Sequence, residues 1–212
     1  MAGFGFGNVG FLGSLGGGVV PVPVGALVSP YIGLSAGQSG TTSASAAFNS
    51  AFTFGAGVPW AISLIHRANA AGAHYVMDLV YGGLSISIIY GYNANTYELY
   101  IDGGGVIRVT GSAINPALAH KIDAVYDGTQ ILLSIDNVLV ATRAGGLPAY
   151  TPGAGAFLKL ETPPSPCELD SVRVTRNGVA IAEYLFAEAS GLVAADTSGN
   201  GFNLTFNAVT HY

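Results

Sequence analysis

Apolar and polar residues alternate along most of the chain after residue 57, in short stretches separated by turn residues. The clearest stretch is Leu84–Ile88, where leucine and isoleucine alternate with serine. Alternation with a period of two is typical of a half-buried β-strand. No segment keeps a helical period of 3.6 residues over several turns. The pattern predicts strands over 61–65, 74–80, 84–88, 97–101, 105–110, 120–126, 130–135, 138–142, 155–160, 169–175, 179–186 and 202–209.

Turn signals stand between the predicted strands. Asp127-Gly128-Thr129 separates 120–126 from 130–135, and Asp136-Asn137 follows the second of these strands. Such pairs favour tight hairpin turns. About a dozen short strands joined in this way predict an all-β, antiparallel sandwich or barrel. We expect its core to contain Trp60, Ile62, Leu64, Ile86, Ile88, Ile131, Leu133, Val172, Val174 and Phe186.

Residues 1–57 have a different composition from the rest. They are rich in glycine, alanine and serine and almost without charge, and glycine-rich backbone is costly to order. We therefore expect an extended N-terminal arm over 1–57, followed by one domain over 58–212. Apolar side chains spaced by glycine favour docking on a partner protein, although a frayed terminus is the alternative. The residues expected to dock are Phe4, Phe6, Phe11, Leu12, Leu15, Val22 and Val24.

The low charge of the chain narrows the classes of partner. Only 9% of the residues are charged and the net charge is −5, whereas ordinary soluble domains carry about 25% charged residues. The seven basic residues form no cluster that could neutralise phosphates, so we expect no nucleic-acid partner and no polybasic membrane contact. So little charge indicates that neighbours or copies of the chain cover its surface, unless Ser, Thr, Asn and Gly coat it.

A single cysteine, Cys167, excludes an internal disulfide and a fold built on such bridges. We expect it to be buried as a small apolar residue. The N-terminus lacks the basic start of a secretion signal, and no apolar run reaches the roughly 18 residues of a membrane span. The expected location is therefore the cytoplasm in which the chain is made, or a particle assembled there.

Three segments carry a resemblance to a known family. Ala124–Val140 contains Tyr-Asp-Gly-Thr and a short hairpin, Leu169–Val174 reads Leu-Asp-Ser-Val-Arg-Val, and Tyr184–Gly201 ends in Asp-Thr-Ser-Gly-Asn-Gly. Together they resemble the laminin-G-like, concanavalin A-like jelly-roll family. In most members the last of these segments precedes the other two, so the strand order is left open. The resemblance implies an antiparallel jelly-roll sandwich for 58–212.

The resemblance also suggests two kinds of chemistry. Glycanases with this fold carry carboxylates at alternate positions of one strand; Glu168 and Asp170 fit, but Val172 stands where a third would be needed. We therefore expect no enzymatic activity. Related jelly rolls often hold a structural calcium, for which Asp170, Asp196 and Asn200 are the candidate ligands. The favoured alternative is an Asx-turn without metal, and no other cofactor is expected.

The remaining candidates are histidines and aromatic residues. His66, His74, His120 and His211 show no zinc-ligand spacing, so we expect them to be isolated surface or interface residues. Rigid rings and adaptable amides suit glycan or protein recognition, whereas packing at a sheet edge is an equally good explanation. The residues concerned gather near a glycine- and asparagine-rich turn: Tyr90, Tyr92, Asn93, Asn95 and Tyr97.

Two functions follow as expectations. Jelly rolls with glycine-rich arms resemble virion proteins of tailed bacteriophages, so the first is a non-enzymatic virion structural protein. It would be a capsid decoration (cement) protein or a tail-associated protein, anchored by its arm to the major capsid or tail protein and to copies of itself. The alternative is a carbohydrate-binding module or receptor-binding adhesin, which explains the lectin-like fold and the Tyr–Asn turn but not the arm.

Overall fold

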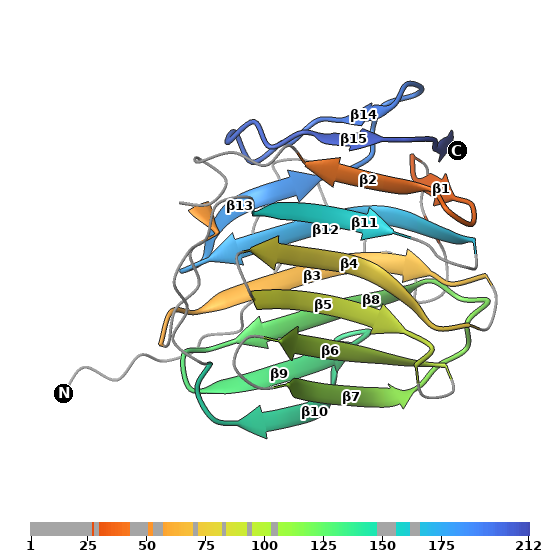
Figure 1. Ribbon diagram of the computed structural model, residues 1–212. Helices are drawn as coiled ribbons and strands as arrows, with labels where there is room; N and C mark the ends of the chain where they lie inside the picture. Colours follow the sequence, from red (N-terminus) through yellow and green to blue (C-terminus); the bar gives the residue numbers. More distant parts are fainter. Residues whose placement is uncertain are drawn as a thin grey trace.

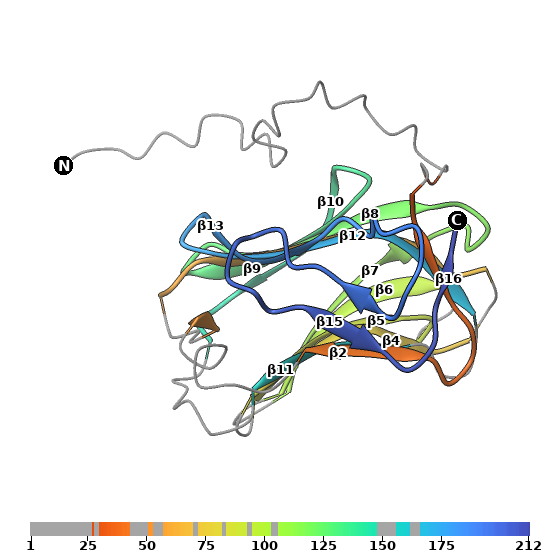
Figure 2. The ribbon, with the colours of Figure 1, turned by 90° about the horizontal axis from the view of Figure 1, so that it is seen from above.

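The computed structural model shows two antiparallel β-sheets packed face to face (Figure 1). It describes residues 27, 30–42, 51–52, 57–69, 72–81, 84–92, 95–102, 106–147, 156–161 and 166–212. Seen from above, β8, β12 and β13 lie in one layer and β2, β4, β5 and β11 in the other (Figure 2). The predicted antiparallel sandwich of jelly-roll type is therefore confirmed.

Within the described residues, each sheet has eight strands. In spatial order, sheet A contains β10 (Val138–Ala144), β9 (Gln130–Ile135), β8 (His120–Tyr126), β3 (Trp60–Arg67), β12 (Cys167–Arg176), β1 (Ile32–Leu34) and β16 (Thr210–His211), with β13 (Val179–Tyr184) also paired to β12. Sheet B contains β14 (Val193–Ala194), β15 (Leu204–Phe206), β2 (Ser39–Thr42), β11 (Phe157–Glu161), β4 (His74–Tyr81), β5 (Leu84–Tyr90), β6 (Thr96–Asp102) and β7 (Ile107–Ala113).

The core lies between the sheets and is built from the alternating residues of both. All ten residues predicted for it, from Trp60 to Phe186, are buried. The strands predicted over 120–126 and 130–135 coincide with β8 and β9. The turn between β9 and β10 places Asp136 and Asn137 at φ of 53° and 65°, a conformation that short polar residues tolerate. Period-two alternation thus located the main strands.

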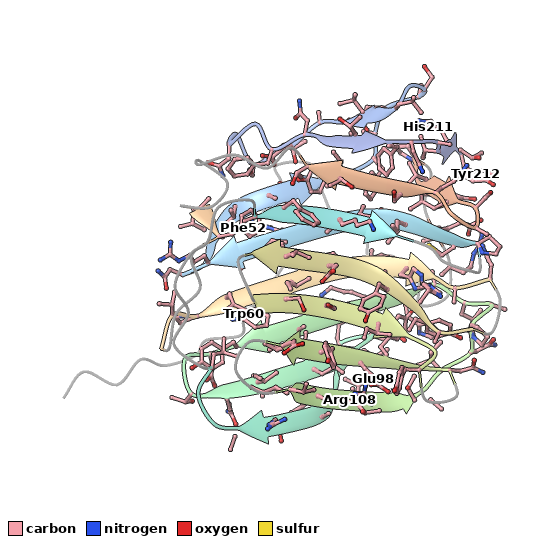
Figure 3. All side chains as sticks on the ribbon, viewed as in Figure 1. Phe52, Trp60, Glu98, Arg108, His211 and Tyr212 are labelled. Carbon is pink, nitrogen blue, oxygen red and sulfur yellow. The ribbon has the colours of Figure 1, made fainter. Side chains whose placement is uncertain are left out.

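The sandwich reaches further toward the N-terminus than the boundary expected at residue 58. Within the segment predicted as an arm, β1 pairs with β12 in sheet A and β2 pairs with β11 in sheet B. Phe52 is also buried in the core (Figure 3). Gly40 lies under the ring of Phe206, and a Cβ atom at Gly33 would lie 2.8 Å from the Tyr212 ring. These two glycines allow close packing.

Strand β3 leads from sheet A to β4 in sheet B, so the chain changes layer between Arg67 and His74. The end of β3, the start of β4 and the start of β12 therefore lie at the same end of the sandwich. None of the described residues forms a helix long and apolar enough to span a membrane.

Candidate functional site

A row of polar side chains crosses the outer face of sheet B. The strand registers align Lys159 of β11, Asp78 of β4, Ser87 of β5, Tyr100 of β6 and Arg108 of β7. We call these five residues the polar row. Their chain neighbours point inward and are buried, so the row itself faces away from the core: Leu158, Leu160, Met77, Leu79, Ile86, Ile88, Leu99, Ile101 and Val109. The Ser87 hydroxyl donates to Asp78 Oδ1 over 2.7 Å.

One end of the polar row is aromatic and cationic. The Arg108 guanidinium carbon lies 4.1 Å from the centre of the Tyr92 ring and 5.7 Å from that of Tyr100. We call these three residues the aromatic corner. Arg108 Nε also lies 3.1 Å from Oε2 of Glu98, which is wholly buried, so the guanidinium is held in place (Figure 3). Tyr92 remains 55% exposed. The corner can therefore present a rigid ring and charged donors to a ligand.

The Tyr–Asn turn predicted as a contact surface is only partly exposed. Tyr90 and Tyr97 are wholly buried, so their prediction as contact residues was wrong. They lie in phase with inward-facing residues of β5 and β6, and their rings pack 5.3 Å apart. The Tyr90 hydroxyl donates a hydrogen bond to Asn95 Oδ1, and the two oxygens are 3.0 Å apart. Tyr92 alone is exposed, and Asn93 lies outside the described residues.

The predicted calcium ligand Asp196 sits in a turn, residues 196–202, that we call the Asp196 turn. Its carboxylate accepts the backbone N–H groups of Glu183, Ser198 and Phe202 at 2.9–3.0 Å. Burial alone would raise the pKa of Asp196, but these hydrogen bonds and one from the Ser198 side chain lower it. The structure therefore contains an Asx-turn, in which Asp196 accepts the N–H of Ser198 two residues along the chain.

Of the other two predicted calcium ligands, Asn200 is hydrogen-bonded to the backbone and Asp170 lies on a different element, strand β12. The Asn200 side-chain amide donates to the Ile181 carbonyl over 2.8 Å, which directs its nitrogen to the backbone of β13. Asp170 lies on β12, at the bulge between Leu169 and Ser171. Among the described residues, neither aspartate belongs to a group of His, Cys, Asp and Glu ligands that converges on one point.

The carboxylates weighed for catalysis lie on the outer face of sheet A. Glu168 is ion-paired with Arg67, both through Nε and through the terminal guanidinium nitrogen. Glu168 and Asp170 alternate with Cys167 and Leu169, which are buried and point inward. Glu168 is therefore held as part of a structural ion pair.

Three of the four histidines are buried and two of them contact each other, so their prediction as isolated surface or interface residues was wrong. His66 is the residue before the last one of β3, His74 begins β4, and the lone cysteine Cys167 begins β12. Their ligating atoms all lie within 4.8 Å of one another. We call these three residues the His–Cys cluster. His66 Nε2 and His74 Nε2 are 3.4 Å apart.

Tyrosine rings surround the cluster. His74, Tyr90 and Tyr97 are cross-strand neighbours in sheet B, and His66 pairs with His120 in sheet A. Burial lowers the pKa of His66 well below its usual value, to which His74 and His120 add, and burial also lowers that of His74. Burial, with a smaller effect of Glu168, raises the pKa of Cys167. With their pKa values shifted in these directions, both imidazoles and the thiol are uncharged at neutral pH.

His120 differs from His66 and His74 because neither of its nitrogens is paired with another histidine. Nδ1 lies 2.7 Å from Asp136 Oδ2, and Nε2 donates to the Asn115 carbonyl over 2.9 Å. His211, on the C-terminal strand β16, donates from Nε2 to the carbonyl of Gly191, which lies just before β14. The side chains of His120 and His211 therefore form hydrogen bonds that connect segments of the fold.

The predicted docking residues Phe4, Phe6, Phe11, Leu12, Leu15, Val22 and Val24 all lie outside the described residues. The roles expected from them, namely attachment to a capsid or tail protein, self-association and a place in a virion, stay predictions of the sequence.

Comparisons with known proteins establish the fold. No protein-family model and no curated protein matches the chain. Similar solved structures include a protein from Bacteroides ovatus that is described as a putative carbohydrate-binding protein. It is 14% identical in sequence and has a TM-score of 0.63, and the match covers 86% of this chain and 59% of that one. Mouse laminin α1 domains LG4-5 match at 11% identity and a TM-score of 0.58, covering 90% of this chain and 48% of that one.

The LG1-3 region of the laminin α2 chain gives a TM-score of 0.55 at 11% identity, covering 86% of this chain and 34% of that one. The chain therefore spans between 34 and 59% of the length of these three structures. The jelly-roll fold suggested by the three sequence segments is confirmed: the chain is similar in fold to laminin G domains and to a carbohydrate-binding jelly roll.

Proposed function

We propose that this chain is a non-catalytic carbohydrate-binding module that holds its ligand on the outer face of sheet B. The observation that carries the proposal is the aromatic corner, where Tyr92 is 55% exposed and stacked against Arg108 at one end of a continuous polar row. Flat aromatic rings bind the apolar faces of sugar rings, and neighbouring polar groups can hydrogen-bond sugar hydroxyls.

The polar row supplies the second part of such a site. Asp78 and Ser87 already share a hydrogen bond of 2.7 Å, and Lys159 lies beside Asp78 in the strand register. The Asp78 carboxylate and the Lys159 ammonium supply an acceptor and a donor, and the Ser87 hydroxyl, which is only 1% exposed, orients Asp78. Because the row follows five strands, an extended oligosaccharide fits it better than a single sugar.

The likeness to a carbohydrate-binding protein supports this choice through the fold, and the row provides the residues. A non-catalytic role agrees with the state of Glu168, which is engaged with Arg67.

The experiment is a glycan-array screen followed by calorimetry with the best oligosaccharide. Truncation of Tyr92 (Tyr92→Ala) removes the exposed ring, and we expect affinity to fall about 5-fold because stacking on an aromatic ring is worth roughly 1 kcal/mol. Tyr212→Ala is the matched control, since Tyr212 is 54% exposed and follows β16 of the other sheet. A screen without any bound glycan, or equal affinity for both variants, would reject the proposal.

A further inference from the structure

We propose that His66, His74 and Cys167 form a buried binding site for one zinc-class transition-metal ion. The three side chains come from three strands and two sheets, and all are at most 2% exposed. Their ligating atoms lie within 4.8 Å of one another, and among the described residues this is the group of His, Cys, Asp and Glu that converges on one point.

The distance between the two imidazoles fits a shared metal ion. Zinc binds histidine nitrogen at about 2.0–2.1 Å and prefers tetrahedral geometry, which puts two such nitrogens about 3.3 Å apart. His66 Nε2 and His74 Nε2 are separated by 3.4 Å. An N–H···N hydrogen bond between them would be longer than the usual range of about 2.7–3.2 Å.

The Nδ1 atom of each histidine has its own hydrogen-bond partner, and these partners direct the two Nε2 lone pairs toward the same point. His74 Nδ1 lies 3.2 Å from the Gly72 carbonyl, which can only accept, so the proton of a neutral His74 is on Nδ1. The Nε2 lone pair of His74 therefore faces His66 and Cys167. A backbone carbonyl on the far nitrogen is the usual second partner of a metal-bound histidine.

His66 is held in the same way by Tyr97. Its Nδ1 lies 2.7 Å from the Tyr97 hydroxyl, which also lies 3.4 Å from the His66 carbonyl and can donate to it. With that donation, Nδ1 carries the His66 proton and Nε2 presents a lone pair. The two Nε2 lone pairs then face each other beside the Cys167 sulfur. Without a cation these lone pairs repel each other, whereas a metal ion between them would be bound by both.

The strands make the site rigid. Leu169 of β12 is the register partner of His66, so Cys167, two residues earlier, points to the same side of sheet A. Ligands on paired strands are held more precisely than ligands on loops. Two imidazoles and one thiolate select zinc, cobalt or copper over calcium and magnesium. Binding releases the thiol proton to solvent, and three protein ligands leave a fourth position for water or another small ligand.

The test is a cobalt titration of the full chain. Because the site is closed, the protein is refolded from urea with a chelator or with one equivalent of Co²⁺. Tetrahedral Co²⁺ gives visible d–d bands, and a thiolate ligand adds a charge-transfer band in the near ultraviolet. Since the chain has one cysteine, that band can come only from Cys167. We expect one Co²⁺ per chain, displaced by Zn²⁺, and X-ray absorption showing one sulfur and two imidazole nitrogens.

Variants connect the signal to the cluster. Cys167→Ser should abolish the charge-transfer band and weaken Co²⁺ binding at least 100-fold, and His74→Ala should weaken it similarly. His211→Ala, at a histidine engaged with the Gly191 carbonyl, is the matched control and should bind as the wild type does. The wild-type spectra decide the question even where a variant fails to fold. Failure of the refolded wild type to bind Co²⁺, or binding without the sulfur band, would overturn the proposal in favour of a histidine pair that shares a proton.

Discussion

The Asp196 turn and the His–Cys cluster both contain residues that are common metal ligands, yet they are opposite in their hydrogen bonding. In the turn, backbone N–H groups of Glu183, Ser198 and Phe202 already occupy the Asp196 carboxylate. In the cluster, donors and acceptors hold the outer nitrogens of both histidines, while the inner ones face each other at 3.4 Å. The turn and the proposed metal site thus differ in the partners of their ligand atoms, and residue type alone is a poor guide.

The largest contrast should appear on removing or adding metal. Refolding the chain with a zinc chelator should lower its free energy of unfolding by about 4 kcal/mol relative to protein in free zinc about 1,000-fold above its Kd. Millimolar calcium should leave the stability unchanged, because the Asp196 oxygens are occupied. Urea denaturation measures both. Stabilisation by calcium, with none by zinc, would reverse the comparison.

Truncating the turn should come next in size. Asp196→Ala leaves the N–H groups that it accepts without that partner, and we expect a loss of about 2 kcal/mol because unsatisfied amides are costly. Asp102→Ala, at an exposed residue at the end of β6, should change stability by less than about 0.5 kcal/mol. Cobalt binding by Asp196→Ala should match the wild type, provided that the two sites are independent.

The effect of Asp196 should also depend on pH. Because the folded-state pKa of Asp196 is lowered, its contribution is complete above the unfolded value of about 3.9 and is lost as the pH falls through the folded value. The stability difference between the wild type and Asp196→Ala should therefore be constant near neutral pH and shrink in acid. Denaturation curves at neutral and acidic pH measure this difference, and a difference that grew in acid would contradict the assignment.

The smallest effect tests how the cluster is oriented. Tyr97→Phe removes the hydroxyl that lies 2.7 Å from His66 Nδ1 and should weaken Co²⁺ binding about 10-fold, as loss of a partner of a metal-bound histidine does. Tyr90→Phe is the matched control, since its hydroxyl donates to Asn95. Equal cobalt affinities for the two variants would show that Tyr97 does not position His66.

The alternation of residues predicted the sandwich well because both sheets bury one face. In Trp60–Arg67 the alternation also carried information about a histidine. Ile62, Leu64 and His66 share the inward phase of β3, so the same alternation that located the strand also indicated a buried histidine. His74 lies in phase with the buried Val76. The cluster was missed because zinc motifs were sought as local spacings, whereas its members meet across two sheets.

The outer face of sheet B shows the same lesson for the binding surface. Proximity to a glycine–asparagine turn suggested Tyr90 and Tyr97, but their phase matches that of Leu99 and the core. Tyr100 and Arg108 have the opposite phase, and only the strand register places them side by side. Register depends on long-range pairing, which no single stretch of sequence specifies.

Glycine at the start of the sandwich has an evolutionary consequence. A side chain at Gly40 would collide with the Phe206 ring, and one at Gly33 would meet Tyr212. Descendants of this sequence should therefore exchange either glycine only together with a smaller residue at its partner position. Correlated substitution of 40 with 206, and of 33 with 212, would identify distant relatives in which the same two sheets are preserved.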